Sequence, residues 1–146
     1  MAFPGKYNIN YYKGDTFQFR IYPKNADGSA FDLTPYSGGG LYDSDDPDTT
    51  PDIPYDSVMF SFASSRGSST WHQAAAWISS DKKYINCAIR GGANGDSQYL
   101  NPGTEYVYDV QITRPTNGST DPGAPSFPII TTVLTGTITV EGQVTP

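Results

Sequence analysis

The chain has 146 residues and a formal net charge of −6, with 36% hydrophobic, 14% aromatic and 16% charged residues. This length suits one domain with a single core, and the aromatic content is too high for a disordered chain. The acidic balance argues against nucleic acid as a partner, because it repels a phosphate backbone. No run approaches the roughly 20 apolar residues of a membrane span, so no membrane partner is expected.

The first third of the chain reads as strands and turns. Residues 16–22 alternate strictly, which predicts a strand with one wet face and with Phe17, Phe19 and Ile21 toward the core. A shorter strand is expected over residues 7–12. Residues 23–29 predict a turn centred on Asp27-Gly28. Two apolar side chains, Phe31 and Leu33, then return to the same core.

Residues 37–56 combine glycine, proline and aspartate, which predicts a long acidic surface loop. Within it, residues 43–48 offer several carboxylate oxygens, so calcium binding is an alternative to a merely solvated loop. However, an EF-hand loop needs Gly at its sixth position and Glu at its twelfth, where Asp48 and Pro54 stand.

Strand patterns resume after this loop, at residues 58–62 and 83–90. Between them, residues 71–78 are ambiguous, because three alanines favour a helix while the flanking Ser and Gly clusters favour a short element. We expect a strand there, with a short helical turn as the alternative.

The last third predicts a hairpin with an enlarged loop. A strand over residues 105–113 follows an Asn-Pro-Gly turn at 101–103, a polar loop spans 114–126, and a strand rich in Ile, Val and Thr covers 128–140. Seven or eight strands with turn signals between them indicate an all-β sandwich of two sheets in one domain, residues 1–146. The expected core is Phe17, Phe19, Ile21, Leu33, Phe60, Tyr108, Val110, Ile112 and Ile138.

Few residues could support catalysis or bind a metal. His72 is the single histidine and Cys87 the single cysteine. Zinc needs about four such ligands, and no motif surrounds either residue. We therefore expect no enzyme, no cofactor, no metal and no intrachain disulfide. Exposed aromatic rings could instead stack on sugars, with Trp71, Trp77 and Tyr99 as candidates; for the tryptophans we favour the alternative that they fill the core.

The two ends of the chain resemble a known family. The segments 11–21, 27–28 and 31–36, with 103–113 and 134–141 at the other end, are similar to immunoglobulin-like tail and baseplate domains of bacteriophages. Related patterns occur in the N-terminal domain of baseplate upper proteins and in uncharacterised virion proteins of marine phages and cyanophages. The middle of the chain departs from this pattern, so the resemblance implies no role for the acidic loop.

The resemblance implies an immunoglobulin-like β-sandwich and a virion structural protein of the tail, baseplate or capsid surface. Its partners would be other virion proteins in a multi-subunit assembly, with self-association an open alternative. Tyr106, after a Pro-Gly turn at the head of a strand, resembles a tyrosine corner, with Tyr108 standing where antibody domains carry cysteine. Such a protein is made in bacterial cytoplasm, which agrees with the lack of a secretory signal and of disulfides. The alternative function is a carbohydrate-binding module that contacts host-surface glycans.

The N-terminal arm, residues 1–6, and the strand after it suggest a contact surface. Aromatic side chains carry a large share of interface energy, and four rings fall within ten residues. We therefore predict that the arm docks on a neighbouring subunit, against the alternative that the rings close their own sandwich. The interface residues would be Phe3, Tyr7, Tyr11 and Tyr12.

Overall fold

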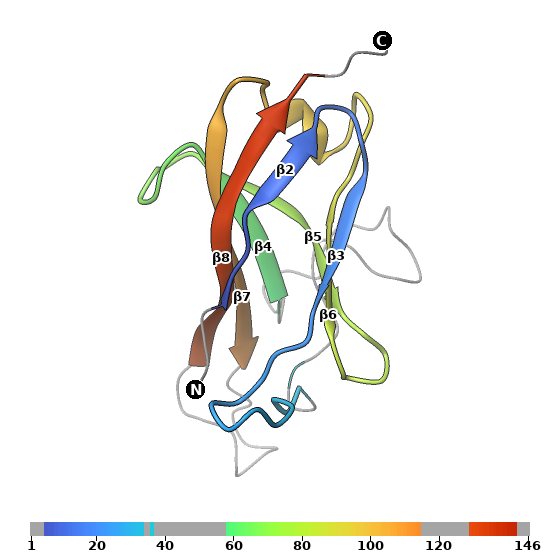
Figure 1. The fold of residues 1–146 in the computed structure, drawn as a ribbon, viewed down its shortest axis with the longest axis vertical. Helices are drawn as coiled ribbons and strands as arrows, with labels where there is room; N and C mark the ends of the chain where they lie inside the picture. The colour runs from blue at the N-terminus through green and yellow to red at the C-terminus, as the bar shows by residue number, and fades with distance from the viewer. Residues whose placement is uncertain (1–4, 34–35, 37–57, 115–128, 143–146) are drawn as a thin grey trace, which may run out of the picture.

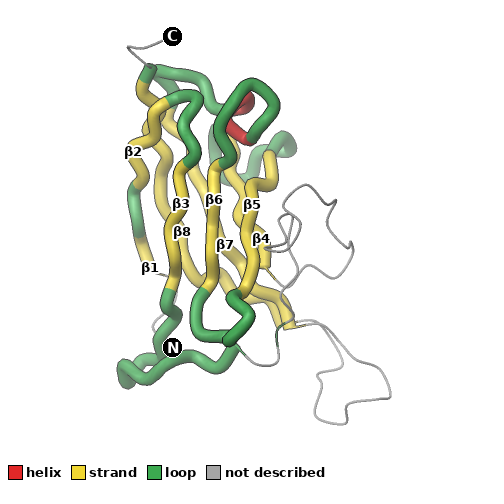
Figure 2. The backbone as a smooth tube through the Cα atoms, turned by 90° about the vertical axis from the view of Figure 1, so that its right-hand side faces the viewer, coloured by secondary structure: helices red, strands yellow, loops and turns green. Residues whose placement is uncertain are grey.

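The protein is nearly all β in a computed structural model that describes residues 5–33, 36, 58–114 and 129–142. In these ranges it has eight strands and one short 3-10 turn, η1 (Asp96–Tyr99), shown in Figures 1 and 2. The strands are β1 (Gly5–Lys6), β2 (Ile9–Tyr12), β3 (Phe17–Ile21), β4 (Val58–Ala63), β5 (His72–Ile78), β6 (Ile85–Ile89), β7 (Glu105–Arg114) and β8 (Ile129–Glu141).

The strands form one continuous, curled sheet in the order β1-β8-β7-β4-β5-β6-β3, with β2 also paired to β8. All neighbours run antiparallel except β1 and β2, which run parallel to β8. Strand β5 joins the two halves of the sheet: residues 72–74 pair with β4, and residues 75–78 pair with β6. In Figure 2, β3, β6 and β5 run side by side on the face turned toward the viewer.

The sheet curls far enough for its two halves to share a core. The ring of Phe19 on β3 lies 5.6 Å from that of Phe60 on β4 and 6.4 Å from that of Tyr108 on β7, measured between centroids. Phe60 and Tyr108 are themselves 5.4 Å apart. Because β3 and β7 lie far apart in the strand order, these contacts close the core between them.

The expected core is confirmed. Six of the nine residues are fully buried, and Phe17, Phe19 and Ile21 are partly buried against them. The outward residues of β3 are exposed, as the alternation predicts. Residues 72–78 form a strand, so the helical alternative is wrong there. The predicted hairpin of the last two strands is also confirmed.

The N-terminal segment lies directly on β8 with little space between the two backbones. The Tyr7 amide donates to the Thr135 carbonyl at 3.0 Å, and the Tyr108 hydroxyl donates to the Tyr7 carbonyl at 2.5 Å. This close approach needs Gly136 on β8, since a Cβ there would lie 1.9 Å from the Tyr7 carbonyl oxygen.

Two predicted loops fall outside the described residues. They are the acidic loop at 37–56, with the calcium alternative that rests on it, and nearly all of the loop at 114–126. They stay predictions.

Candidate functional site

The connection between β4 and β5 carries the most exposed tryptophan of the described chain, Trp71, at 54% exposure. It immediately precedes β5 and borders two adjoining hollows. The preference for tryptophan in the core is therefore wrong for Trp71, while Trp77 on β5 is half-buried. Trp71 lies outside β5, so the inward face of that strand does not include it.

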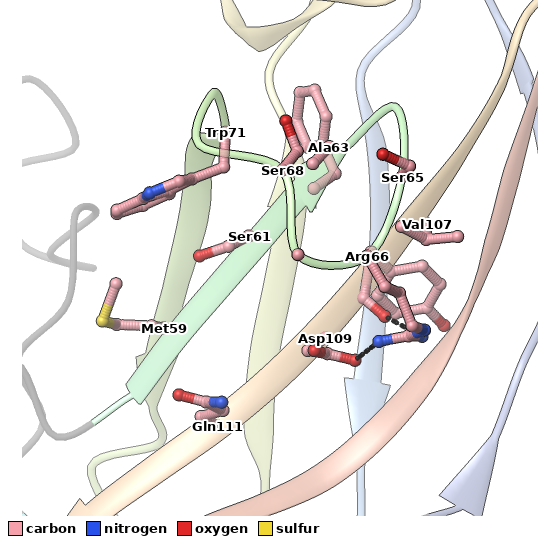
Figure 3. A pocket seen from close by; sticks show the side chains of 13 residues that line it. Met59, Ser61, Ala63, Ser65, Arg66, Ser68, Trp71, Val107, Asp109 and Gln111 are labelled. Carbon is pink, nitrogen blue, oxygen red and sulfur yellow. Dashed lines mark hydrogen bonds and ion pairs between the residues drawn. The ribbon is translucent and has the colours of Figure 1, made fainter.

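The first hollow lies over the outward-facing side chains of β4 and β7 (Figure 3). Its floor carries Met59 and Ser61 from β4 with Asp109 and Gln111 from β7, side chains that neighbour each other in register. Trp71 stands at its edge in Figure 3. The hollow therefore offers amide, hydroxyl and thioether groups beside an indole ring.

Arg66 closes one side of the first hollow. Its guanidinium lies 2.8 Å from the Asp109 carboxylate and also donates to the Thr135 hydroxyl on β8. Both members of the ion pair are solvent-exposed in part, so it adds little to stability. Arg66 joins the β4–β5 connection, which also carries Trp71, to β7 and β8.

The second hollow lies beside both ends of the β4–β5 connection, around His72. The Tyr99 ring is half-exposed and stacks on the His72 ring, with 4.1 Å between centroids and 28° between planes. The other described side chains that line this hollow carry no formal charge. They include Thr70, Asn101 and Tyr106.

A buried carboxylate holds His72 in place. The Asp96 side chain is fully buried and lies 2.8 Å from His72 Nε2. It also accepts from the Arg90 amide at 2.9 Å and from the Arg90 guanidinium at 3.0 Å. Burial by itself would raise the pKa of Asp96, but the hydrogen bonds from His72 and Arg90 outweigh it and lower the pKa below its usual value. The charged carboxylate can only accept, so His72 Nε2 carries the proton that it shares.

Glycines let the loop before η1 fold around Asp96. A Cβ on Gly95 would lie 2.4 Å from two backbone carbonyl oxygens, and one on Gly91 would lie 2.5 Å from the Gly14 carbonyl oxygen. The η1 turn also contacts the turn between β2 and β3, because the Gly14 amide donates to the Ser97 hydroxyl at 2.7 Å. Tyr99 is the last residue of η1, so these contacts also restrain its position.

The two residues considered for catalysis, Cys87 and His72, lie in different surroundings. Cys87 is buried in the core, and burial raises the pKa of its thiol, which opposes formation of a nucleophilic thiolate. His72 has its Nε2 occupied by Asp96. Among the described residues, no three His, Cys, Asp or Glu side chains are grouped to hold a metal ion.

The predicted interface residues differ in their exposure to solvent. Tyr12 is 55% exposed and Tyr7 42% exposed, near the outer edge of the sheet. Tyr11 is a core residue whose hydroxyl donates to the Asp15 carbonyl at 2.6 Å, so it cannot reach a neighbouring subunit. Alternation along β2 explains the difference, because neighbouring residues face opposite sides. Phe3 lies outside the described residues.

Several residues of the hollows were not predicted from the sequence. Arg66 and Asn101 line the hollows, and Asp96 supports His72 from outside them. Arg66 bonds to Asp109, 43 residues away, and Asp96 to His72, 24 residues away, so the sequence gives no local sign of either contact. The one local signal is the glycine-rich run at 91–95, which indicates a tight turn but not that the next residue is a buried carboxylate.

Comparisons with known proteins add no assignment to these features. No protein-family model matches the chain, and neither a curated protein nor a solved structure does. None of the described segments is a helix long and apolar enough to cross a membrane.

Proposed function

We propose that the chain is an immunoglobulin-like β-sandwich domain and a structural component of a bacteriophage particle, on its tail, baseplate or capsid surface. It acts by contact with other virion proteins and not by catalysis. The function is proposed from the resemblance of both chain ends to phage tail and baseplate domains, and the features of the fold described next support the immunoglobulin-like arrangement.

The strand order is the first support for an immunoglobulin-like arrangement. In that fold the second, fifth and fourth strands form one sheet, and the third, sixth and seventh form the other. If β2 is the first strand, the neighbours β3-β6-β5 and β4-β7-β8 follow this order. Two departures are the pairing of β2 with β8 and the pairing of β5 with both β4 and β6.

A hydrogen bond at Tyr106 is the observation that carries this fold assignment. The Tyr106 hydroxyl accepts from the Asn101 amide, five residues earlier, at 2.9 Å. A tyrosine corner has this geometry: its Tyr lies near the start of the sixth strand and bonds to backbone just upstream. Two residues later, Tyr108 occupies the position of the second cysteine in antibody domains.

The central rings agree with this alignment. Antibody domains pack a tryptophan of the third strand against a disulfide between the second and sixth strands. Here Phe60 lies on the third, with Phe19 on the second and Tyr108 on the sixth, each within 6.4 Å of the others between ring centroids. Three aromatic rings thus replace the disulfide and tryptophan, which suits a chain with one cysteine.

The outer edge at β2 is the contact surface that we propose. Within the described residues, β2 has a hydrogen-bonded neighbour only in β8, and such an edge is open to pairing with another chain. The exposed rings of Tyr7 and Tyr12 flank it. A well-buried aromatic anchor contributes about 2 kcal/mol or more to an interface.

Replacing Tyr7 and Tyr12 together with serine tests this surface. We expect a folded protein that no longer joins the particle, measured by quantitative mass spectrometry of purified virions from a phage that carries the variant. Tyr22→Ser is the matched control, since Tyr22 is 54% exposed but lies away from β2, directly after β3. Absence of the wild-type protein from virions would refute the function, whereas normal incorporation of the double variant would refute only this surface.

A further inference from the structure

The two hollows beside Trp71 are a second surface, distinct from the β2 edge. Their volumes are about 280 and 490 Å³, and ligand pockets in proteins are roughly 300–1,000 Å³. Both are lined in part by Phe62, Ala63 and Trp71, so an elongated ligand could occupy both while lying across the indole. Figure 3 shows the indole standing clear of β4 at the edge of the first hollow.

The chemistry of the lining selects the ligand class. Two half-exposed rings, Trp71 and Tyr99, offer flat apolar surface. In the second hollow, no described lining residue is Asp, Glu, Lys or Arg, and in the first the only such side chains, Arg66 and Asp109, neutralise each other. A charged ligand would gain no ionic partner, whereas a neutral molecule with apolar faces and many hydroxyls finds rings, amides and hydroxyls together.

The Tyr99 ring is also held in place before any ligand arrives. Tyr99 stacks on His72, which Asp96 holds from below. Arg66 anchors the connection that carries Trp71. Preorganisation of this kind lowers the entropy cost of binding.

A polypeptide is a poorer match for the same surface. Extended peptides gain much of their affinity by pairing with an open strand edge. Strand β4, whose residues line both hollows, is already hydrogen-bonded to β5 on one side and β7 on the other. It has no free edge to offer a peptide backbone.

We propose that the two hollows are a binding site for a neutral oligosaccharide, with one sugar ring packed on Trp71 and another on Tyr99. Asn101 and Thr70 in the second hollow, with Gln111 in the first, supply hydrogen bonds to sugar hydroxyls. The site is separate from the β2 edge, so glycan binding and incorporation into a particle can be tested independently.

The full-length protein can be tested on an array of neutral oligosaccharides that includes bacterial surface glycans, with calorimetric titration of each glycan bound. We expect Trp71→Ala to weaken binding about tenfold or more, which is the effect of losing a well-packed aromatic anchor. Tyr99→Ala should also weaken binding, while Tyr99→Phe keeps the ring and should bind nearly as the wild type. Because Trp71 is exposed, its replacement should leave the thermal melting transition unchanged.

The control is Tyr22→Ala, which removes an equally exposed ring elsewhere and should bind as the wild type. A Trp77→Phe variant leaves Trp71 as the single tryptophan, so its fluorescence should change on titration with the bound glycan. Binding to no neutral glycan, or equal binding by Trp71→Ala, would overturn the proposal. So would Trp71-dependent capture of peptides from a peptide library without any glycan binding.

Discussion

Gly136 is the residue on which attachment of the N-terminal segment to β8 depends. An added Cβ would meet the Tyr7 carbonyl oxygen at 1.9 Å and the Tyr108 ring at 3.0 Å, and the first of these is backbone. We predict that Gly136→Ala lowers the free energy of unfolding by about 2 kcal/mol, within the usual cost of overpacking. Urea unfolding followed by circular dichroism measures the change.

Gly142→Ala is the control for that substitution. Gly142 lies just past β8, and the nearest atom to its added Cβ would be Pro102 Cβ at 3.9 Å, an ordinary contact. The free energy of unfolding of Gly142→Ala should stay within about 0.5 kcal/mol of the wild type, the usual range for surface substitutions. Equal stability of Gly136→Ala and Gly142→Ala would mean that the backbone at Tyr7 does not pack closely against Gly136.

At the scale of elements, Asp96 at the start of η1 links this turn to His72 on β5 and to Arg90, which directly follows β6. The pKa of this carboxyl is lower in the folded protein than its usual value, because the hydrogen bonds from His72 and Arg90 outweigh the effect of burial. The charged form therefore favours folding. This stabilisation is complete well above the pKa of an unfolded aspartate, about 3.9, and is lost as the pH falls through the folded pKa.

We predict that the free energy of unfolding falls as the pH is lowered from 6 toward 3, and that Asp96→Asn flattens this fall. At neutral pH the variant should be less stable by about 2 kcal/mol, because its hydrogen bonds to Arg90 lose their charge. Urea titrations at several pH values measure both effects. Glu105→Gln, an exposed carboxylate on β7, should keep the wild-type pH dependence. An unchanged slope in Asp96→Asn would refute this role of Asp96.

For the whole molecule, Cys87 reports whether the core is closed. It lies on β6, is fully buried, and has a thiol whose pKa is raised by burial. We predict that a thiol reagent such as Ellman's reagent reacts at once with the protein in urea but only very slowly with the native protein. Labelling in native buffer should then proceed at the rate of global unfolding. Fast labelling without denaturant would show that the two halves of the sheet separate locally.

Local pattern determined much of the architecture. Strict alternation over β3 and β4, with the long β-branched run of β8, predicted these strands, because a half-buried strand must alternate. The nine core residues named from the sequence all lie in or against the core, but most of the buried residues, such as Ile9, Ile85 and Leu100, were not named. Turn chemistry located the breaks between strands. The ambiguity at residues 71–78 was resolved by pairing: β5 satisfies its backbone against both β4 and β6, which a helix could not do.

Only the tertiary structure decided the candidate sites. A carboxylate in a connecting loop becomes a buried partner of His72 because the chain folds back across 24 residues, and no local pattern records such a contact. Local pattern also did not decide whether Trp71 and Tyr11 are buried, because aromatic residues occur both in cores and on contact surfaces. Trp71, just before β5, is exposed beside two hollows, whereas Tyr11, on the inward side of β2, lies in the core. Solvent exposure is a property of the packed molecule and not of the residue type.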